Sequence, residues 1–255
     1  MSALVLDGVS KQFGGLQAVS RLSMTVPPGH ITGLIGPNGA GKTTVVNLIT
    51  GVFKLSSGSV RFGDIDLTES PRHVVARAGI ARTFQTIRLL PDATVLDNIM
   101  IGMYRHQRSS LLSQLFHLRA SRSETQACIE RAHALLRRFG MERYAAFPAS
   151  TLSYGDQRRV EMMRALASEP RLLLLDEPVA GMNDVEARRL GDIFLELAQG
   201  GMAVLLIEHN IGFVSRICKH IVVLDSGRNI AEGSPDQILN NPEVIEAYLG
   251  SDFHA

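Results

Sequence analysis

The most constraining feature of this chain is the segment 36–43, which reads Gly-Pro-Asn-Gly-Ala-Gly-Lys-Thr. It follows the apolar run 31–35 and precedes a segment, 44–50, whose helical pattern stops at Gly51. In such a strand-loop-helix unit, glycines let backbone N–H groups approach a triphosphate, the helix start points at it, and Lys42 adds an ammonium. The hydroxyl of Thr43 would hold Mg²⁺. The predicted nucleotide-binding residues here are Gly36, Pro37, Asn38, Gly39, Ala40, Gly41, Lys42, Thr43 and Thr44.

Polar residues with catalytic chemistry follow two later apolar runs. Asp176 and Glu177 come directly after run 172–175, where Asp176 would bind Mg²⁺, directly or through water, and Glu177 would polarise the attacking water. His209 lies just beyond run 203–207, at the carboxyl end of a predicted strand, and would hydrogen-bond the γ-phosphate and that water. The alternative for Asp176 and Glu177 is that they only cap a turn before Pro178. The alternative for His209 is a purely structural role. Because the chain also has a phosphate loop, we favour catalytic roles for Lys42, Glu177 and His209.

The patterning predicts an α/β fold. Short apolar or alternating segments separated by glycine-rich turns indicate a sheet-rich first part, and alternating strands and helices from 172 to 224 indicate a parallel sheet. Between them lies a helical stretch, clearest in 121–139, where Ser121 and Glu124 form a predicted capping box. We expect one folded domain, 1–255. In it, 1–86 and 166–255 form the nucleotide-binding core with a β subdomain, and 87–165 form a helical subdomain.

Composition excludes several other classes of protein. Lys and Arg number 26 against 25 Asp and Glu, so no basic excess points to nucleic acid as a partner. The two cysteines, Cys128 and Cys218, are too far apart in sequence to suggest a disulfide framework or a metal cluster. The apolar runs fall far short of the roughly 20 residues of a membrane-spanning helix, and residues 1–7 do not resemble a signal peptide. We therefore expect an intracellular protein.

The segment 152–157, Leu-Ser-Tyr-Gly-Asp-Gln, resembles the signature of the ABC ATPase family, and its position between the phosphate loop and the acidic strand fits that family. The resemblance covers essentially the whole chain. It implies a P-loop NTPase fold with a RecA-like parallel sheet core, an antiparallel β subdomain and a helical signature subdomain, with ATP and Mg²⁺ as cofactors. Ser153 and Gly155 begin a predicted helix and offer a hydroxyl and N–H groups to an anion. The resemblance implies that this anion is the γ-phosphate held by a second subunit, in a head-to-tail dimer with two ATP.

Other positions are assigned from the resemblance alone. Phe13 resembles the aromatic residue that stacks on adenine, although a buried aromatic is an equal alternative. Gln85 resembles the glutamine that reaches Mg²⁺ and heads the helical subdomain, and 180–183 resembles the loop that communicates across the dimer. The family more commonly has Gln at the position of Asp156 and Gly at that of Tyr154. We expect the Asp156 side chain to point away from the nucleotide.

Within the family, segments 82–89, 152–159 and 241–250 resemble the branched-chain amino acid importers, and the basic stretch 104–119 favours their LivG-type ATP-binding subunit. This implies a second ATPase subunit, either LivF-like or identical, two membrane permeases, a periplasmic solute-binding protein acting indirectly, and a peripheral place on the cytoplasmic face of the plasma membrane. The solute stays open, with urea and amides among the alternatives. Alternative functions are a lipopolysaccharide-export ATPase and a soluble nucleic-acid-associated ABC protein. A third is a cassette that binds ATP without hydrolysing it, and the presence of Glu177 and His209 argues against that one.

Overall fold

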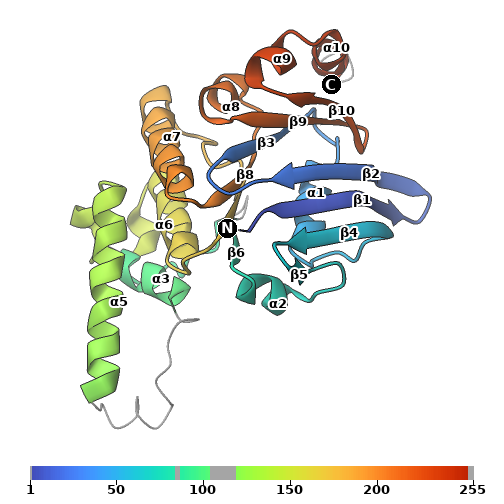
Figure 1. The fold of residues 1–255 in the computed structure, drawn as a ribbon. Helices are drawn as coiled ribbons and strands as arrows, with labels where there is room; N and C mark the ends of the chain where they lie inside the picture. Colours follow the sequence, from blue (N-terminus) through green and yellow to red (C-terminus); the bar gives the residue numbers. More distant parts are fainter. Residues whose placement is uncertain (1, 84–86, 104–118, 252–255) are drawn as a thin grey trace. The chain divides into compact units, whose positions relative to one another are not determined.

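The computed structural model describes residues 2–83, 87–103 and 119–251, and within this range the chain divides into two compact units. The first unit comprises Met1–Arg82, Arg171–Pro178 and Asp184–Ala255, and the second comprises Thr83–Pro170 and Val179–Asn183. Figure 1 labels the elements of both. The predicted helical subdomain, 87–165, falls in the second unit, which also takes the short segment Val179–Asn183.

A six-stranded sheet forms the centre of the first unit, in the order β10-β9-β3-β8-β7-β6. Every neighbouring pair is parallel except β9 and β10. Three inner strands, β3, β7 and β8, are buried at every position, which explains their largely apolar sequences, because a parallel sheet is covered on both faces. The strands are β3 (Ile31–Ile35), β6 (Ile80–Arg82), β7 (Leu172–Asp176), β8 (Ala203–Ile207), β9 (His220–Asp225) and β10 (Arg228–Gly233).

An antiparallel sheet in the order β2-β1-β4-β5 completes the strands of this unit. Its elements are β1 (Leu4–Phe13), β2 (Leu16–Val26), β4 (Ser57–Phe62) and β5 (Ile65–Asp66). The first two strands are longer than the predicted segments 3–9 and 22–26, because β1 and β2 continue as a hairpin until Phe13 pairs with Leu16. The alternation of buried and exposed residues is typical of a sheet with one face on the core.

Helices of the first unit pack on these sheets. The apolar side of α1, with Val45, Val46, Leu48 and Ile49, shares one core cluster with residues of both sheets. A side chain at Gly33 of β3 would meet Val214 and Cys218, so the helix α8 and its end cover β3 at that position. The helices are α1 (Lys42–Ile49), α2 (Arg72–Arg77), α7 (Asp184–Gln199), α8 (Ile211–Ile217), α9 (Pro235–Leu239) and α10 (Pro242–Ser251).

The second unit is helical, with α3 (Val95–Gly102), α5 (Arg119–Arg138), α6 (Tyr154–Leu166) and short 3₁₀ turns at Glu142–Tyr144 and Ala149–Thr151. The predicted capping box at Ser121 is wrong, because α5 already includes Arg119 and places Ser121 inside the helix. A real capping box begins α3, between Thr94 and Asp97. The predicted end of the long helix at Gly140 is confirmed, since Gly140 follows with φ 65°.

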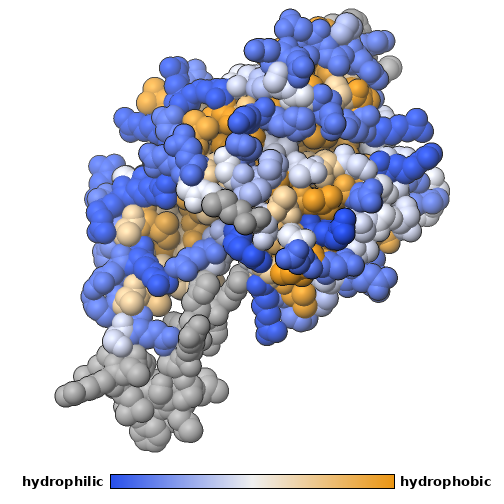
Figure 2. All heavy atoms as spheres, viewed as in Figure 1, coloured by the Kyte–Doolittle hydropathy of each residue, from blue (hydrophilic) through white to orange (hydrophobic). Residues whose placement is uncertain are grey.

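No helix within the described residues combines the length and the apolar character that crossing a bilayer requires. On the face drawn in Figure 2, hydrophilic residues cover most of the described surface and hydrophobic ones form separate patches.

Candidate active site

The predicted phosphate loop connects β3 to α1, and its backbone explains two of its glycines. Gly36 has φ 146° and Gly41 has φ 102°, conformations that side chains rarely adopt. A Cβ at Gly36 would lie 2.0 Å from the carbonyl oxygen of Leu224, and one at Gly41 would lie 2.6 Å from that of Ala18. The loop is thus held against the ends of other strands. Gly41 precedes α1 and offers no side-chain cap, so the first N–H groups of α1 suit an anion.

Lys42 is the first residue of α1 and is buried, with 9% of its surface exposed. Its ammonium donates hydrogen bonds to the carbonyl oxygens of Gly36, at 2.6 Å, and of Pro37, at 2.9 Å. Burial lowers the pKa of Lys42, while the charges of Glu177 and Asp176 act in the opposite direction. The predicted lysine and both predicted carboxylates therefore share one electrostatic site, at the carboxyl ends of strands that lie close together in the sheet.

Asp176 ends β7, and its side chain is only 5% exposed. Its Oδ2 accepts a hydrogen bond from Nη2 of Arg82 at 2.9 Å, while Nη1 of Arg82 donates to Oδ1 of Asn47 at 2.7 Å. Sequence reasoning used Arg82 only as part of a family resemblance and missed Asn47. The sequence showed a cationic residue, Arg82, but nothing in it indicated that Asn47 and Asp176 accept its hydrogen bonds.

Glu177 and His209 face each other beyond the ends of β7 and β8. Glu177 has φ 49°, and its N–H donates to the carbonyl of Ile207 at 2.9 Å. Nδ1 of His209 lies 3.7 Å from Oε1 of Glu177, and the two side chains are 62% and 25% exposed. The buried Glu208, which sequence reasoning missed, accepts hydrogen bonds from the N–H groups of His209 and Asn210. A carboxylate and an imidazole are thus presented together where water can reach them.

Three loop positions and Phe13 are exposed, whereas Ala40 of the loop is buried. Asn38, Gly39 and Thr43 are exposed. Phe13, at the tip of the β1–β2 hairpin, is 41% exposed and touches Phe53 edge to face, with 5.1 Å between ring centroids. Its ring is therefore not a buried core residue, and its stacking on adenine stays a prediction. Gln85 and the basic residues 104–118 lie outside the described residues.

The C-terminal helix supplies a contact that sequence reasoning missed. Tyr248 of α10 is half-buried, and its hydroxyl oxygen is shielded from solvent near the backbone of Gly36. Burial raises the pKa of Tyr248, and the nearby backbone of Gly36 acts in the opposite direction. The tail thus reaches the first residue of the phosphate loop.

In the second unit, Ser153 caps α6 as predicted from its position. Its Oγ accepts a hydrogen bond from the N–H of Asp156 at 3.2 Å and donates to Oδ2 of Asp156 at 2.8 Å. Asp156 also pairs with Arg159 at 3.2 Å. The carboxylate of Asp156 thus lies against the hydroxyl that would meet the phosphate, and its orientation relative to the nucleotide stays a prediction.

The segment 180–183 belongs to the same unit as the signature. A Cβ at Gly155 would lie 3.8 Å from Met182, and one at Gly181 would lie 3.4 Å from Tyr154. The predicted dimer-contacting loop and the start of α6 are therefore neighbours.

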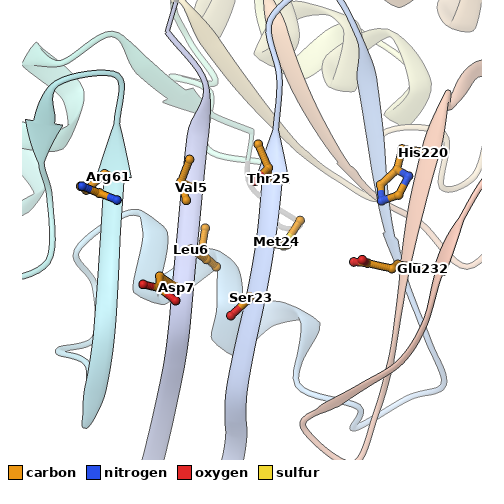
Figure 3. A pocket seen from close by; sticks show the side chains of 9 residues that line it. All are labelled: Val5, Leu6, Asp7, Ser23, Met24, Thr25, Arg61, His220 and Glu232. Carbon is orange, nitrogen blue, oxygen red and sulfur yellow. The ribbon is translucent and has the colours of Figure 1, made fainter.

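A separate hollow of about 410 Å³ lies elsewhere in the first unit (Figure 3). Val5, Asp7, Arg61, His220 and Glu232 are among its lining residues. None of the predicted site residues lines it, so it is distinct from the phosphate loop.

Comparison with known families gives two matches. Residues 19–180 match the model of the ABC transporter family, and residues 228–254 match that of the branched-chain amino acid ATP-binding cassette transporter. The second match covers β10 and the C-terminal helices, including Tyr248.

Curated relatives match nearly the whole chain. The chain is 40% identical over 248 residues to the high-affinity branched-chain amino acid transport ATP-binding protein LivG of Escherichia coli, with 97% of each chain covered. It is equally similar, with the same coverage, to BraF of Pseudomonas aeruginosa, which carries the same description. The probable LivG of Archaeoglobus fulgidus is 37% identical, with 98% of this chain and 96% of that protein covered.

Solved structures agree with the fold. A nucleotide-free ATP-binding cassette from an ABC transporter has a TM-score of 0.84 and 34% identity, with 97% and 99% of the two chains covered. The ADP conformation of an ATP-binding cassette of an ABC transporter has a TM-score of 0.85 and 35% identity, with 98% and 99% covered. These likenesses confirm the predicted P-loop NTPase fold. The chain therefore belongs to the ABC transporter family and is an ATP-binding subunit of its LivG type.

Proposed function

We propose that this chain binds ATP with Mg²⁺ on the loop 36–43 and hydrolyses it to drive the import of branched-chain amino acids. The observation that carries the proposal is geometric: Asp176, Glu177 and His209 follow β7 and β8 at the same edge of the parallel sheet at which β3 leads into the loop with Lys42. Such an edge is where open α/β sheets bind their ligands.

Each residue has a distinct role in this proposal. The Lys42 ammonium binds phosphate oxygens. In this structure it donates its hydrogen bonds to two loop carbonyl oxygens instead. Glu177 orients the attacking water and takes its proton, and His209 positions the same water and the γ-phosphate. These residues supply positioning and charge, the main contributions of a protein to phosphoryl transfer.

The oxygen donors present fit Mg²⁺, which prefers hydroxyl, carboxylate and phosphate oxygens. Thr43, exposed at the start of α1, and Asp176, at the end of β7, would hold it, and Gln85 is a further proposed ligand. When bound, the ion would neutralise charge on the phosphates.

The helical unit provides the second half of the chemistry. Ser153 and Gly155 start α6, where a hydroxyl, N–H groups and the positive end of the helix dipole suit the γ-phosphate bound by a partner subunit. The active form is then a head-to-tail dimer of two ATPase subunits, identical or LivF-like, with two ATP between them. Segment 180–183, next to Tyr154, would communicate across this dimer.

The transport role follows from the relatives, whose names specify branched-chain amino acid transport. In this role the chain would sit peripherally on the cytoplasmic face of the plasma membrane and bind two permease subunits. A periplasmic solute-binding protein would act on the same permeases without touching this chain.

The experiment is uptake of radiolabelled leucine, valine and isoleucine after deletion of the chain, with co-purification of its membrane partners. We expect uptake to fall and to return with the wild-type chain but not with Lys42→Ala. Unchanged uptake of all three amino acids would remove the solute assignment, while ATP hydrolysis by the purified complex tests the enzymatic part separately.

A further inference from the structure

One guanidinium joins the acidic strand to the helix that follows the phosphate loop. Arg82 is the last residue of β6 and pairs in register with Leu174 of β7, which puts it at the same sheet edge as Asp176. It donates from Nη2 to Asp176 and from Nη1 to Asn47 of α1, at 2.9 and 2.7 Å. The side chains of Arg82 and Asp176 are only 11% and 5% exposed.

The position of Asn47 on α1 determines which part of the site this bridge connects to Asp176. Asn47 lies four residues after Thr43 on α1, so the two side chains share one side of the helix, a turn apart. The bridge from Asn47 through Arg82 to Asp176 therefore connects the carboxylate to the side of α1 that bears the Thr43 hydroxyl.

A buried ion pair is poor evidence of a purely stabilising role, because removing two charges from water offsets much of their attraction. What a guanidinium provides here is geometry, since its rigid fork serves two acceptors at a fixed angle. A lysine has one ammonium on a flexible stem in place of this planar fork, so it does not hold the two acceptors in the same fixed geometry.

We propose that Arg82 is a positioning residue for Mg²⁺: it fixes Asp176 relative to α1, so that the two proposed metal ligands, Asp176 and Thr43, keep a constant separation. Metal sites depend on such outer hydrogen bonds, whose loss typically lowers metal affinity by about 10–100-fold. The inference rests on the proposed Mg-ATP site.

The test measures binding of a fluorescent ATP analogue to the purified full chain, once with saturating Mg²⁺ and once with EDTA. The dissociation constant in EDTA divided by that in Mg²⁺ gives the factor by which the metal strengthens nucleotide binding. For Arg82→Lys we expect this ratio to fall about tenfold or more, with metal-free affinity unchanged, because the glycine loop and Lys42 are intact. Asn47→Ala, which keeps the Arg82–Asp176 pair, should show a smaller decrease in the same direction.

Arg171→Lys is the matched control. Arg171 precedes β7 at the opposite end from Asp176 and donates to the carbonyl of Ala78, so its loss should leave the ratio unchanged. Equal losses with and without metal in both Arg82→Lys and Asn47→Ala would show a general structural role and overturn the inference, as would ratios equal to wild type. Failure of the wild-type chain to bind the analogue at all would instead refute the proposed function. Should Arg82→Lys fail to fold, Asn47→Ala decides.

Discussion

The Asp156→Asn substitution tests the most unusual feature of the signature. The hydroxyl of Ser153 has one proton, and it donates this proton to the Asp156 carboxylate at 2.8 Å. A γ-phosphate at the same hydroxyl must compete for that proton and approach a like charge. We therefore expect neutral Asp156→Asn to bind ATP more productively in the dimer than wild type does.

The size of the effect follows from the local geometry. A phosphate oxygen bonded to the Ser153 hydroxyl lies about 2.7 Å from it, so it is at most about 5.5 Å from Oδ2 of Asp156. Two unit charges at this distance repel by about 3 kcal/mol at an effective dielectric constant of 20, and by under about 1 kcal/mol in water. Arg159, 3.2 Å from the carboxylate, offsets part of this. A net gain of about 1 kcal/mol is roughly fivefold in affinity.

The assay is ATP hydrolysis by the purified complex as a function of ATP concentration. For Asp156→Asn the concentration giving half-maximal rate should fall roughly fivefold, although α6 loses about 0.3–1 kcal/mol of favourable charge-dipole interaction. Arg159→Gln, which removes the offsetting cation, should shift it upward. An unchanged or higher ATP concentration for the half-maximal rate of Asp156→Asn would contradict the proposed repulsion. A thermal melting curve of the variant shows whether such a result comes from loss of the fold instead.

Three further predictions concern single positions. Lys42→Ala should abolish ATP hydrolysis, because the loop loses its only ammonium; an undiminished rate would contradict the phosphate-loop interpretation. Gly36→Ala should remove nucleotide binding while far-UV circular dichroism stays native, since its Cβ would lie 2.0 Å from the Leu224 carbonyl oxygen; wild-type affinity would contradict this. Asn98→Ala should lower the free energy of unfolding in urea by about 2–3 kcal/mol, because buried Asn98 accepts from the N–H of Leu90 and donates to the carbonyl oxygens of Leu90, Ala93 and Thr94; a loss under about 0.5 kcal/mol would show that these bonds are replaced.

The core of the fold could be predicted because its signals are local. Continuous apolar runs at 31–35 and 203–207 matched β3 and β8 in their bounds, since strands covered on both faces need no alternation. The phosphate loop was equally clear, because glycine spacing and the helix after it lie in one short segment. The hairpin of β1 and β2 was underestimated, because its distal half extends beyond the core and carries exposed residues.

Other contacts between distant segments, which no motif marks, could not be predicted. Arg82 meets Asp176 across 94 positions, and its neighbours in the sequence do not distinguish this bond from a solvated arginine. The contact of Tyr248 with Gly36 likewise depends on how the last helix returns to the sheet. The Ser121 capping box failed for another reason, since a Ser-x-x-Glu pattern also occurs inside a helix that begins earlier.

The division into two units has a covalent consequence. The chain passes between them four times, after Arg82, Pro170, Pro178 and Asn183. Two of these crossings fall at Arg82, which pairs with Asp176, and one residue after Glu177, so two of the four covalent links between the units lie next to proposed site residues. Large hinge motions usually concentrate in a few such bonds. A hinge at either of these two links would therefore change the backbone directly beside Arg82 or Glu177.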